Sequence, residues 1–327
     1  FTGSSEYMKK HFRDYAEFVK KYIKNNSKII EIGSNDGTFL QNFIDESING
    51  IGFEPSKNVA DKAIKNKVNT INDFFNKNSV KKLKDYSGNT DLICASNVIC
   101  HVPNLNDLIE SVDLLLSKNG TFVFEEPYLG SMFKKVSYDQ IYDEHIYMFS
   151  ASSIAKIFSR FNLQLVDAIP QSTHGGSMRY IIQRNKNAEI SNNLKNIINY
   201  EKEQRLNSID SCIEFKKKCE ISKNRIIEKI RNFKSSGKSI CGYAATSKST
   251  TILNYCNINS NDIDFICDTT KEKIGKFSPG MHIPIKDMNY FHNNLTDCVY
   301  LFAWNHKEEI LNKERKFEGQ WFSHVEI

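Results

Sequence analysis

The residues best suited to catalysis in this chain lie in one short run, Tyr142-Asp143-Glu144-His145, flanked by further aromatic residues. A histidine titrates near neutral pH, so its imidazole can remove a proton from a substrate. A neighbouring carboxylate or phenol can orient that imidazole or stabilise developing charge. A single histidine in such a segment is more often structural, but the density of titratable groups favours catalysis here. We therefore predict that Tyr142, Glu144 and His145 form a catalytic group.

A second set of polar residues begins at the end of an apolar strand, in the run Lys28-Ile-Ile-Glu-Ile-Gly-Ser-Asn-Asp-Gly37. Its glycine spacing, Gly33-x-x-x-Gly37, lacks the Gly-x-Gly-x-x-Gly that receives a pyrophosphate in dinucleotide-binding turns. The carboxylates of Glu31 and Asp36 would repel a diphosphate and attract an amino group or a sulfonium. The two glycines allow a ligand to approach the backbone closely. The run therefore favours a cofactor with an adenosine and a charged tail.

Two later strand ends extend this prediction. The run Ile51-Gly52-Phe53-Glu54 places an acid about twenty residues further on, where it can accept both hydroxyls of a ribose. After the third strand, Asn72, Asp73 and Phe74 can cap an adenine with polar groups and an aromatic face. Phe74 and Phe75 as ordinary core residues are an equal alternative. The pattern predicts a class I S-adenosylmethionine methyltransferase domain, in preference to two buried strands with solvated acids at their ends.

The elements that must position these residues follow from alternating strand and helix patterns. After an amphipathic helix over about Glu6–Lys24, strands are expected at 28–32, 50–54, 68–71, 91–96 and 120–125. Strands separated by helices predict a doubly wound parallel α/β sheet. Strands at 163–168 and 178–183, on either side of a Gly-Gly turn, would complete it as an antiparallel pair. The carboxyl end of the fourth strand should lie beside the cofactor, which adds Ser96, Asn97 and His101.

The rest of the chain divides into two further parts. We predict a methyltransferase domain over 1–187, a helical connector over 188–236 and a smaller Rossmann-like domain over 237–327. The connector is highly charged but keeps an apolar stripe at helical spacing, which argues against disorder. In the third part, the small-residue turn at 244–250 opens a helix and carries Lys248, an arrangement that can hold a phosphate. Tight strand-to-helix packing without a ligand is the equal alternative.

Composition narrows the classes of partner. The chain has 44 basic and 39 acidic residues, and its lysine pairs lie in helix-like segments, so we expect solvated faces and no nucleic-acid partner. No apolar run approaches the length of a membrane span, and we expect no membrane association. Eight cysteines occur without a C-x-x-C pair, several inside apolar strands. They indicate reduced, buried thiols in a cytoplasmic protein and no metal site in this chain.

The motifs taken together resemble one known family. The runs at 31–37, 52–56, 97–103, 142–145, 174–179 and 278–285 resemble the sugar C-methyltransferases of deoxysugar biosynthesis. The resemblance covers nearly the whole chain, and the combination is far more specific than any single motif. It implies a methyltransferase domain followed by a smaller Rossmann-like domain, and methylation of a carbon in a nucleotide-linked 4-keto-deoxysugar.

The same resemblance implies roles for individual residues. The keto group acidifies the neighbouring C–H, and His145 would remove this proton, with Tyr142 and Glu144 assisting around the enolate that attacks the methyl group. S-adenosylmethionine would be held by Glu31, Gly33, Ser34, Asn35, Asp36, Gly37, Glu54, Asn72, Asp73, Phe74, Ser96, Asn97 and His101. The sugar nucleotide, as the small-molecule partner, would lie near His174, Gly175, Arg179 and Lys248.

Two departures from the family keep alternatives open. Family members usually begin with a cysteine-ligated zinc module, so zinc is expected only if such a module lies upstream. A family tyrosine near the active site falls around the start of this sequence, where Phe1 precedes Thr2. Without it, an O- or N-methyl acceptor becomes an alternative. A nicotinamide-dependent oxidoreductase or a non-catalytic nucleotide-sugar binding protein is less favoured, because neither turn carries Gly-x-Gly-x-x-Gly and the Tyr-Asp-Glu-His run would have no role.

Overall fold

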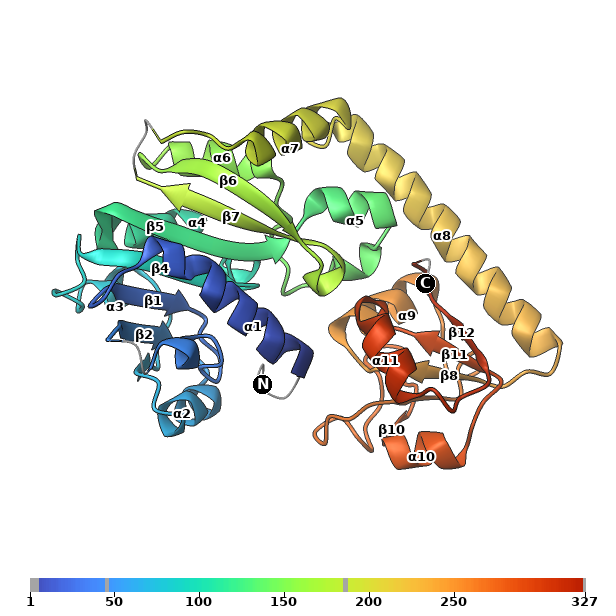
Figure 1. Ribbon diagram of the computed structural model, residues 1–327. Helices are drawn as coiled ribbons and strands as arrows, with labels where there is room; N and C mark the ends of the chain where they lie inside the picture. Colours follow the sequence, from blue (N-terminus) through green and yellow to red (C-terminus); the bar gives the residue numbers. More distant parts are fainter. Residues whose placement is uncertain (1–5, 45–46, 185–187, 326–327) are drawn as a thin grey trace. The chain divides into compact units, whose positions relative to one another are not determined.

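The computed structural model describes residues 6–44, 47–184 and 188–325, and the chain forms two compact units (Figure 1). The first unit comprises Phe1–Tyr128, Ile146–Gln171 and Ser177–Asn207, and the second comprises Leu129–His145, Ser172–Gly176 and Ser208–Ile327. The run that contains Tyr142 and His145 therefore groups with the C-terminal half of the chain. The sequence analysis had placed it in the methyltransferase domain.

A seven-stranded sheet with the order β3-β2-β1-β4-β5-β7-β6 forms the centre of the first unit. Its strands are β1 (Lys28–Ile32), β2 (Asn49–Phe53), β3 (Thr70–Ile71), β4 (Thr90–Ser96), β5 (Leu116–Pro127), β6 (Gln164–Gln171) and β7 (Ser177–Gln183). Strands β1 to β5 pair in parallel, and β7 pairs antiparallel with both β5 and β6. The predicted doubly wound sheet, completed by an antiparallel pair, is confirmed.

The first helix shows why these residues fold as they do. Phe12, Tyr15, Ala16 and Val19 recur at helical spacing and are buried, so this face packs on the sheet. The Tyr15 hydroxyl donates to the carbonyl of Val123 (2.8 Å), and Figure 1 shows α1 lying across one face of the sheet. The helices of this unit are α1 (Glu6–Val19), η2 (Lys20–Tyr22), η3 (Leu40–Phe43), α2 (Lys57–Lys65), α3 (Lys77–Val80), η4 (Ile99–His101), α4 (Leu105–Leu115), α6 (Ala151–Ser159) and α7 (Asn192–Glu203).

The second unit is built on a smaller sheet of five strands in the order β10-β9-β8-β11-β12, all paired in parallel. The strands are β8 (Ile240–Tyr243), β9 (Phe265–Cys267), β10 (Ile285–Lys286), β11 (Cys298–Leu301) and β12 (Gln320–Phe322). The helices are α5 (Leu129–Lys135), η5 (Tyr138–Gln140), η6 (Thr173–Gly175), α8 (Ile209–Ser235), α9 (Ser247–Cys256), α10 (Met288–Asn293), η7 (Trp304–His306) and α11 (Lys307–Lys313). Parallel strands joined through helices give the Rossmann-like arrangement that was predicted.

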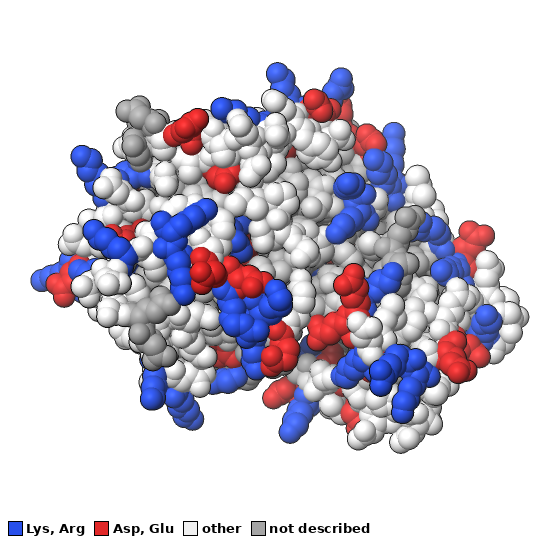
Figure 2. Space-filling model, in the orientation of Figure 1, with Lys and Arg blue, Asp and Glu red and all other residues white. Residues whose placement is uncertain are grey.

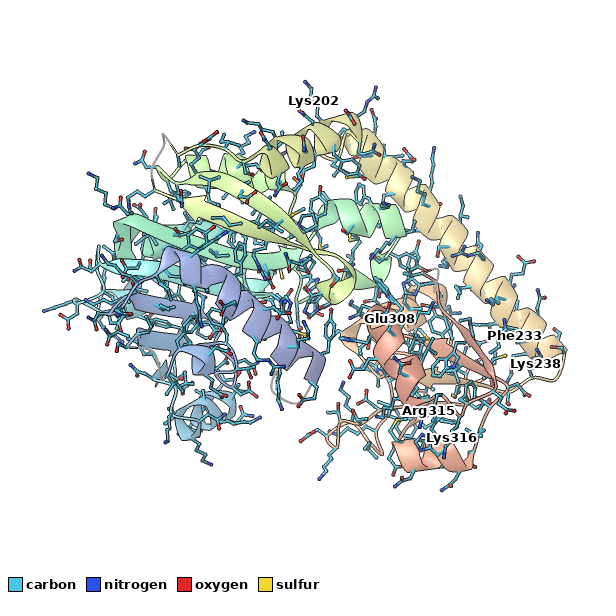
Figure 3. All side chains as sticks on the ribbon, in the orientation of Figure 1. Lys202, Phe233, Lys238, Glu308, Arg315 and Lys316 are labelled. Carbon is cyan, nitrogen blue, oxygen red and sulfur yellow. The ribbon has the colours of Figure 1, made fainter. Side chains whose placement is uncertain are left out.

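The charged stretch before this sheet is helical, as its apolar stripe predicts. It contains α7, which belongs to the first unit, and the 27-residue α8, which belongs to the second. Ser208 caps α8 by accepting the Ser211 N–H (3.2 Å). At the other end, the Lys238 ammonium lies 5.4 Å from the centre of the Phe233 ring, and both residues are labelled in Figure 3.

The surface charges are mixed and most of the thiols are buried, as the composition predicts. Basic and acidic side chains are interspersed over the face shown in Figure 2. Seven of the eight cysteines are buried, and Cys212 on α8 is exposed. Among the described residues, no helix is both long and apolar enough to cross a membrane.

Candidate active site

A cavity of about 510 Å³ opens at the carboxyl ends of β1, β2 and β4 in the first unit. Open α/β sheets bind their ligands at this edge, where strand order reverses. Nine of the thirteen predicted cofactor residues line it: Glu31, Gly33, Ser34, Asn35, Glu54, Phe74, Ser96, Asn97 and His101. The sheet therefore brings together residues from three strand ends that lie far apart in the sequence.

The turn after β1 depends on glycine. Gly33 has φ +68°, and a Cβ there would overlap the Val98 side chain. Gly37 has φ +80°, and a Cβ would lie 2.7 Å from Cγ2 of Val68. Residues with a Cβ rarely adopt such φ values, so both positions favour glycine for conformation and for space. Gly33 thereby exposes backbone to the cavity, whereas Gly37 does not line it.

The Glu54 carboxylate is fixed at the end of β2. Its Oε2 accepts the Asn35 N–H (3.1 Å) and its Oε1 accepts the Ser56 N–H (2.8 Å). Each carboxylate oxygen keeps a second lone pair, so Glu54 can still accept hydroxyl groups from a ligand. Asn72 lies behind this strand end, and its amide donates to the carbonyls of Glu54 and Pro55 (both 2.9 Å). Asn72 therefore supports Glu54 from outside the cavity lining.

Glu31 is the most unusual group in the cavity wall. Burial raises the pKa of its carboxyl well above the usual value, and the negative charges of Asp36 and Glu54 raise it further. Within the described residues, Glu31 Oε2, Ser34 Oγ and Asn97 Oδ1 are buried without a hydrogen-bond partner. Buried polar atoms are costly unless satisfied, so these three atoms call for hydrogen-bond partners from a ligand.

Asp36 lies outside the cavity lining. Its carboxylate is 2.9 Å from the Lys62 ammonium and accepts the Thr38 hydroxyl (2.7 Å), which ties the turn to α2. Asp73 also lies outside, where its Oδ1 accepts the Phe74 N–H (2.8 Å). Phe74 is 67% exposed, and Phe75 is buried edge-on against Phe53, as a core aromatic would be; both rings line the cavity.

A loop that lines the cavity is held by a buried carboxylate that has no signal in the sequence. Glu126, at the end of β5, accepts the N–H groups of Val98 (3.0 Å) and Ile99 (2.6 Å). This bond pair fixes η4, whose His101 reaches the cavity. Burial raises the pKa of the Glu126 carboxyl to about 7.

The predicted catalytic group lies in the second unit. His145 Nδ1 is 2.8 Å from the carbonyl oxygen of Gln140, and its Nε2 is 2.7 Å from the Tyr142 hydroxyl. A carbonyl only accepts, so Nδ1 carries the proton, and in the neutral imidazole Nε2 holds the lone pair that receives the Tyr142 O–H. Glu144 is exposed and makes no hydrogen bond within the described residues. The geometry thus joins His145 to Tyr142 and leaves Glu144 apart.

Some of the residues predicted to bind the sugar nucleotide lie around Trp304, and others do not. The ammonium groups of Lys248 and Lys135 lie 5.2 Å and 5.7 Å from the centre of the Trp304 ring. Lys135 also donates to the carbonyl of Gly175 (2.6 Å), where a Cβ would overlap the same ring. His174 precedes Gly175 in η6 with a left-handed φ of 53°. Burial lowers the pKa of both lysines, although the charge of Asp139 opposes this for Lys248.

Arg179 is placed differently, because it belongs to β7 of the first unit. Its Nη2 and Nε lie 2.6 Å and 2.7 Å from Oε1 of Glu125, and His11 Nε2 lies 2.6 Å from the other oxygen. The guanidinium also stacks on the Tyr15 ring at 4.5 Å. Arg179 is 5% exposed, and its guanidinium contacts Glu125 and the Tyr15 ring of α1. This buried position does not support a role in substrate binding.

The small-residue turn of the second unit is hydrogen-bonded by a carboxylate of the same unit. Asp268, at the end of β9, accepts the N–H groups of Ala245 and Thr270 (both 2.7 Å). The Lys273 ammonium donates to the Ala245 carbonyl (2.7 Å). A Rossmann-like site would offer a turn N–H of this kind to a phosphate. The carboxylate occupies it, so this turn is a poor site for a dinucleotide.

Comparison with known proteins identifies the family. Residues 5–168, half of the chain, match the family described as a methyltransferase domain, and residues 172–325 match the C-methyltransferase C-terminal domain. The chain belongs to the S-adenosylmethionine-dependent C-methyltransferases. C-methyltransferase NovU from Streptomyces niveus is 29% identical over 296 residues, which covers 90% of this chain and 70% of that protein.

Solved structures of methyltransferases also resemble this C-methyltransferase. A S-adenosylmethionine-dependent methyltransferase from Thermotoga maritima has 16% identity and a TM-score of 0.41, covering 54% of this chain and 89% of that one. One from Aquifex aeolicus has 9% identity and a TM-score of 0.39, covering 53% and 97%. The assignment stands on the family match and the sheet order, not on these neighbours.

The cavity of the C-methyltransferase fits its cofactor. When bound, S-adenosylmethionine supplies an electrophilic methyl group on a sulfonium. The buried polar atoms of Glu31, Ser34 and Asn97 that lack a partner within the described part of the chain suit its amino group and hydroxyls, and the acidic wall suits its positive charge. Glu54 is the residue placed to accept ribose hydroxyls.

Sequence reasoning missed a further set of cavity residues in the C-methyltransferase. They are Phe12, Ile32, Thr38, Phe39, Phe53, Pro55, Phe75, Asn76, Val98, Val102, Pro103, Asn104 and Asp107. Most are apolar and carry no pattern apart from that of the core. Asn104 had a detectable signal, because it caps α4 by accepting the Asp107 N–H (3.1 Å).

Proposed function

We propose that this C-methyltransferase methylates a carbon next to the keto group of a nucleotide-linked 4-keto-deoxysugar. The observation that carries the proposal is the fixed imidazole of His145, whose Nδ1 faces the Gln140 carbonyl and whose Nε2 faces Tyr142. An imidazole whose Nδ1 faces a carbonyl keeps its lone pair on Nε2, and this lone pair is suited to removing a proton from a carbon acidified by a neighbouring ketone.

Proton transfer requires an exchange of partners at Nε2. The substrate C–H replaces the Tyr142 hydroxyl there, and the displaced phenol is then a hydrogen-bond donor for the enolate oxygen. His145 takes the proton on Nε2 while the C–H electron pair moves into the enolate. Bound S-adenosylmethionine would supply the methyl group to the enolate carbon, and its sulfur would keep the electron pair of the broken sulfur–methyl bond.

The likeness of the carboxyl-terminal half to the C-methyltransferase family and the charges of the second unit support a nucleotide-sugar acceptor. We propose that Lys248 and Lys135, whose ammonium groups lie near the buried Trp304 ring, bind its diphosphate. His174 and Gly175 shape the same site. Ile146, the residue after His145, donates its N–H to the Cys100 carbonyl (2.9 Å), beside His101 of the cofactor cavity.

Two assays test the proposal. The enzyme is incubated with nucleotide-4-keto-deoxysugars in D2O without cofactor, and deuterium uptake next to the ketone is followed by mass spectrometry; labelled S-adenosylmethionine is then added and methyl gain is measured. We expect both in the wild type, and loss of both in His145→Gln. His282→Asn is the matched control, because it changes a histidine with a left-handed φ of 53°, which asparagine tolerates.

The outcomes separate the alternatives. Methyl gain on oxygen or nitrogen without deuterium uptake would replace the enolate mechanism with deprotonation of a heteroatom. Absence of methyl gain with every ketosugar would remove the substrate assignment. A nicotinamide-dependent reaction is disfavoured by the Asp268 carboxylate in the second turn, and titration with nicotinamide cofactors checks it.

A further inference from the structure

The orientation of the His145 imidazole depends on a backbone carbonyl, and therefore on the turn that carries it. Gln140 is the last residue of η5, and all three residues of that turn are buried. The Gln140 side chain points back into the same segment, where its Nε2 donates to the Ser137 hydroxyl oxygen (2.8 Å). The carbonyl of Gln140 can hold His145 only while η5 itself is held.

Asp139 is the residue that anchors η5. Its Oδ2 accepts the Trp304 Nε1–H (2.7 Å), and its Oδ1 lies 3.1 Å from Nε2 of His324. Both side chains of the Asp139–His324 pair are fully buried. Burial alone raises the pKa of the Asp139 carboxyl, but the neighbouring His324, the charge of Lys248 and the Trp304 N–H together hold it below the usual value. The anchor is therefore an ionised carboxylate in the interior of the second unit.

The partners of Asp139 are themselves fixed by the five-stranded sheet. Tyr300 on β11 places its hydroxyl 3.2 Å from Nδ1 of His324, and the Arg225 guanidinium donates to the His324 carbonyl (2.8 Å). Trp304 opens η7, the next element after β11. The sheet thus holds His324 and Trp304, these hold Asp139, and Asp139 holds the turn that presents the Gln140 carbonyl.

We propose that Asp139 is a positioning residue that, with Trp304 and His324, fixes η5 so that the Gln140 carbonyl keeps His145 in its Nδ1–H tautomer with Nε2 as the base. The proposal rests on the proposed function of His145. Under this proposal, the Asp139 carboxylate sets the tautomer of the base without contacting His145 or the substrate.

The test is nitrogen NMR of enzyme labelled with ¹⁵N in its histidine rings, with the His145 signals assigned by their loss in His145→Gln. In the wild type we expect Nδ1 to carry the proton. Asp139→Asn keeps the shape but removes the charge, and Trp304→Phe keeps the ring but removes the N–H. We expect both to give averaged tautomer signals for His145. Asp139→Asn should lower kcat by roughly 10- to 100-fold, the size expected for a misplaced catalytic group.

Glu314→Gln is the matched control. Glu314 is also a buried carboxylate of the second unit, with the Tyr243 hydroxyl at 2.9 Å and His292 at 2.8 Å, but it does not touch η5. We expect it to leave the His145 signals and kcat unchanged. A wild-type His145 protonated on Nε2, or unaltered His145 signals in the folded variants, would overturn the proposal. If Asp139→Asn does not fold, Trp304→Phe decides by the same signals.

The two proposals fail in different ways. If the tautomer signals respond as expected but no ketosugar is methylated, the proposed function fails and the positioning role stands. If His145→Gln abolishes deuterium uptake while Asp139→Asn retains wild-type signals and kcat, the positioning role fails and the function stands.

Discussion

Single carboxylates with similar sequence signals have different tasks in this enzyme. Glu31 and Asp36 flank the same glycine turn, yet Glu31 keeps a buried oxygen without a partner among the described residues, whereas Asp36 is paired with Lys62. Glu54 combines both behaviours, because backbone N–H groups fix it while lone pairs remain for a ligand. Cofactor affinity is therefore expected to depend on Glu31 and Glu54 directly and on Asp36 through the turn.

Glu54→Gln tests this at the cofactor. The amide is neutral, and only its oxygen can accept a hydrogen bond from a ribose hydroxyl. A hydrogen bond to a charged group is worth about 1.5–3 kcal/mol. We therefore expect the affinity for S-adenosylhomocysteine to fall roughly 10- to 100-fold. Isothermal titration calorimetry measures it. Asp61→Asn, an exposed acid on α2, is the control. Equal affinity in wild type and Glu54→Gln would show that Glu54 does not bind the ribose.

Gly175→Ala tests a steric requirement. The residue has φ +86° and its Cβ would overlap the Trp304 ring, so we expect a loss of stability of about 2–4 kcal/mol, from backbone strain and overpacking together. Gly237→Ala is a matched control, because φ is +76° there but no atom lies within 4 Å of the added Cβ. It should lose only about 1 kcal/mol. Thermal unfolding measures both, and equal losses would contradict the overlap with Trp304.

These residues also show what the sequence can reveal. Glu31, Gly33, Glu54 and His101 were predictable, because parallel strands end at one edge and local motifs mark those ends. Trp304 was not, because the chain brings it beside Gly175 and Asp139 only through the second sheet, and the Trp304–Asp139 bond spans 165 residues. Asp36 was wrongly predicted to line the cavity. Its carboxylate instead pairs with Lys62 on another element, a contact that the sequence does not reveal.

At the scale of elements, the loop at η4 depends on the protonation of Glu126. Its pKa is raised to about 7 from an ordinary 4.5 by burial. Because the folded-state value is the higher one, the folded protein binds more protons between those two pH values, and the contribution of this group to stability is lost as pH rises through that window. The loss is on the order of 3 kcal/mol.

Glu126→Gln should remove this dependence, since the amide stays neutral and can still accept the N–H groups of Val98 and Ile99. Urea unfolding of wild type and variant at pH 5 and pH 8 measures the free energy of unfolding. We expect the free energy of unfolding of the variant, relative to that of the wild type, to be higher at pH 8 than at pH 5. A difference that stays constant would mean that Glu126 does not titrate in this range.

At the scale of the molecule, cofactor and acceptor residues are assigned to different units. Every residue lining the cofactor cavity belongs to the first, whereas Lys135, Lys248, Gly175 and Trp304 belong to the second. Hydrogen exchange read by mass spectrometry tests this division. S-adenosylhomocysteine should slow exchange at the ends of β1, β2 and β4, and thymidine diphosphate should slow it around η6 and η7. Protection of the same segments by both ligands would contradict the separate assignment.

The chain order of the second unit has a consequence for synthesis. Asp139 leaves the ribosome 165 residues before Trp304, and His324 comes later still. At about 5–20 residues per second, the delay is on the order of ten seconds. During translation the Asp139 carboxylate has neither of these partners, so η5 cannot settle until the last strand has emerged. Nascent chains should therefore acquire the cofactor domain first and an oriented catalytic base only after the second sheet has emerged.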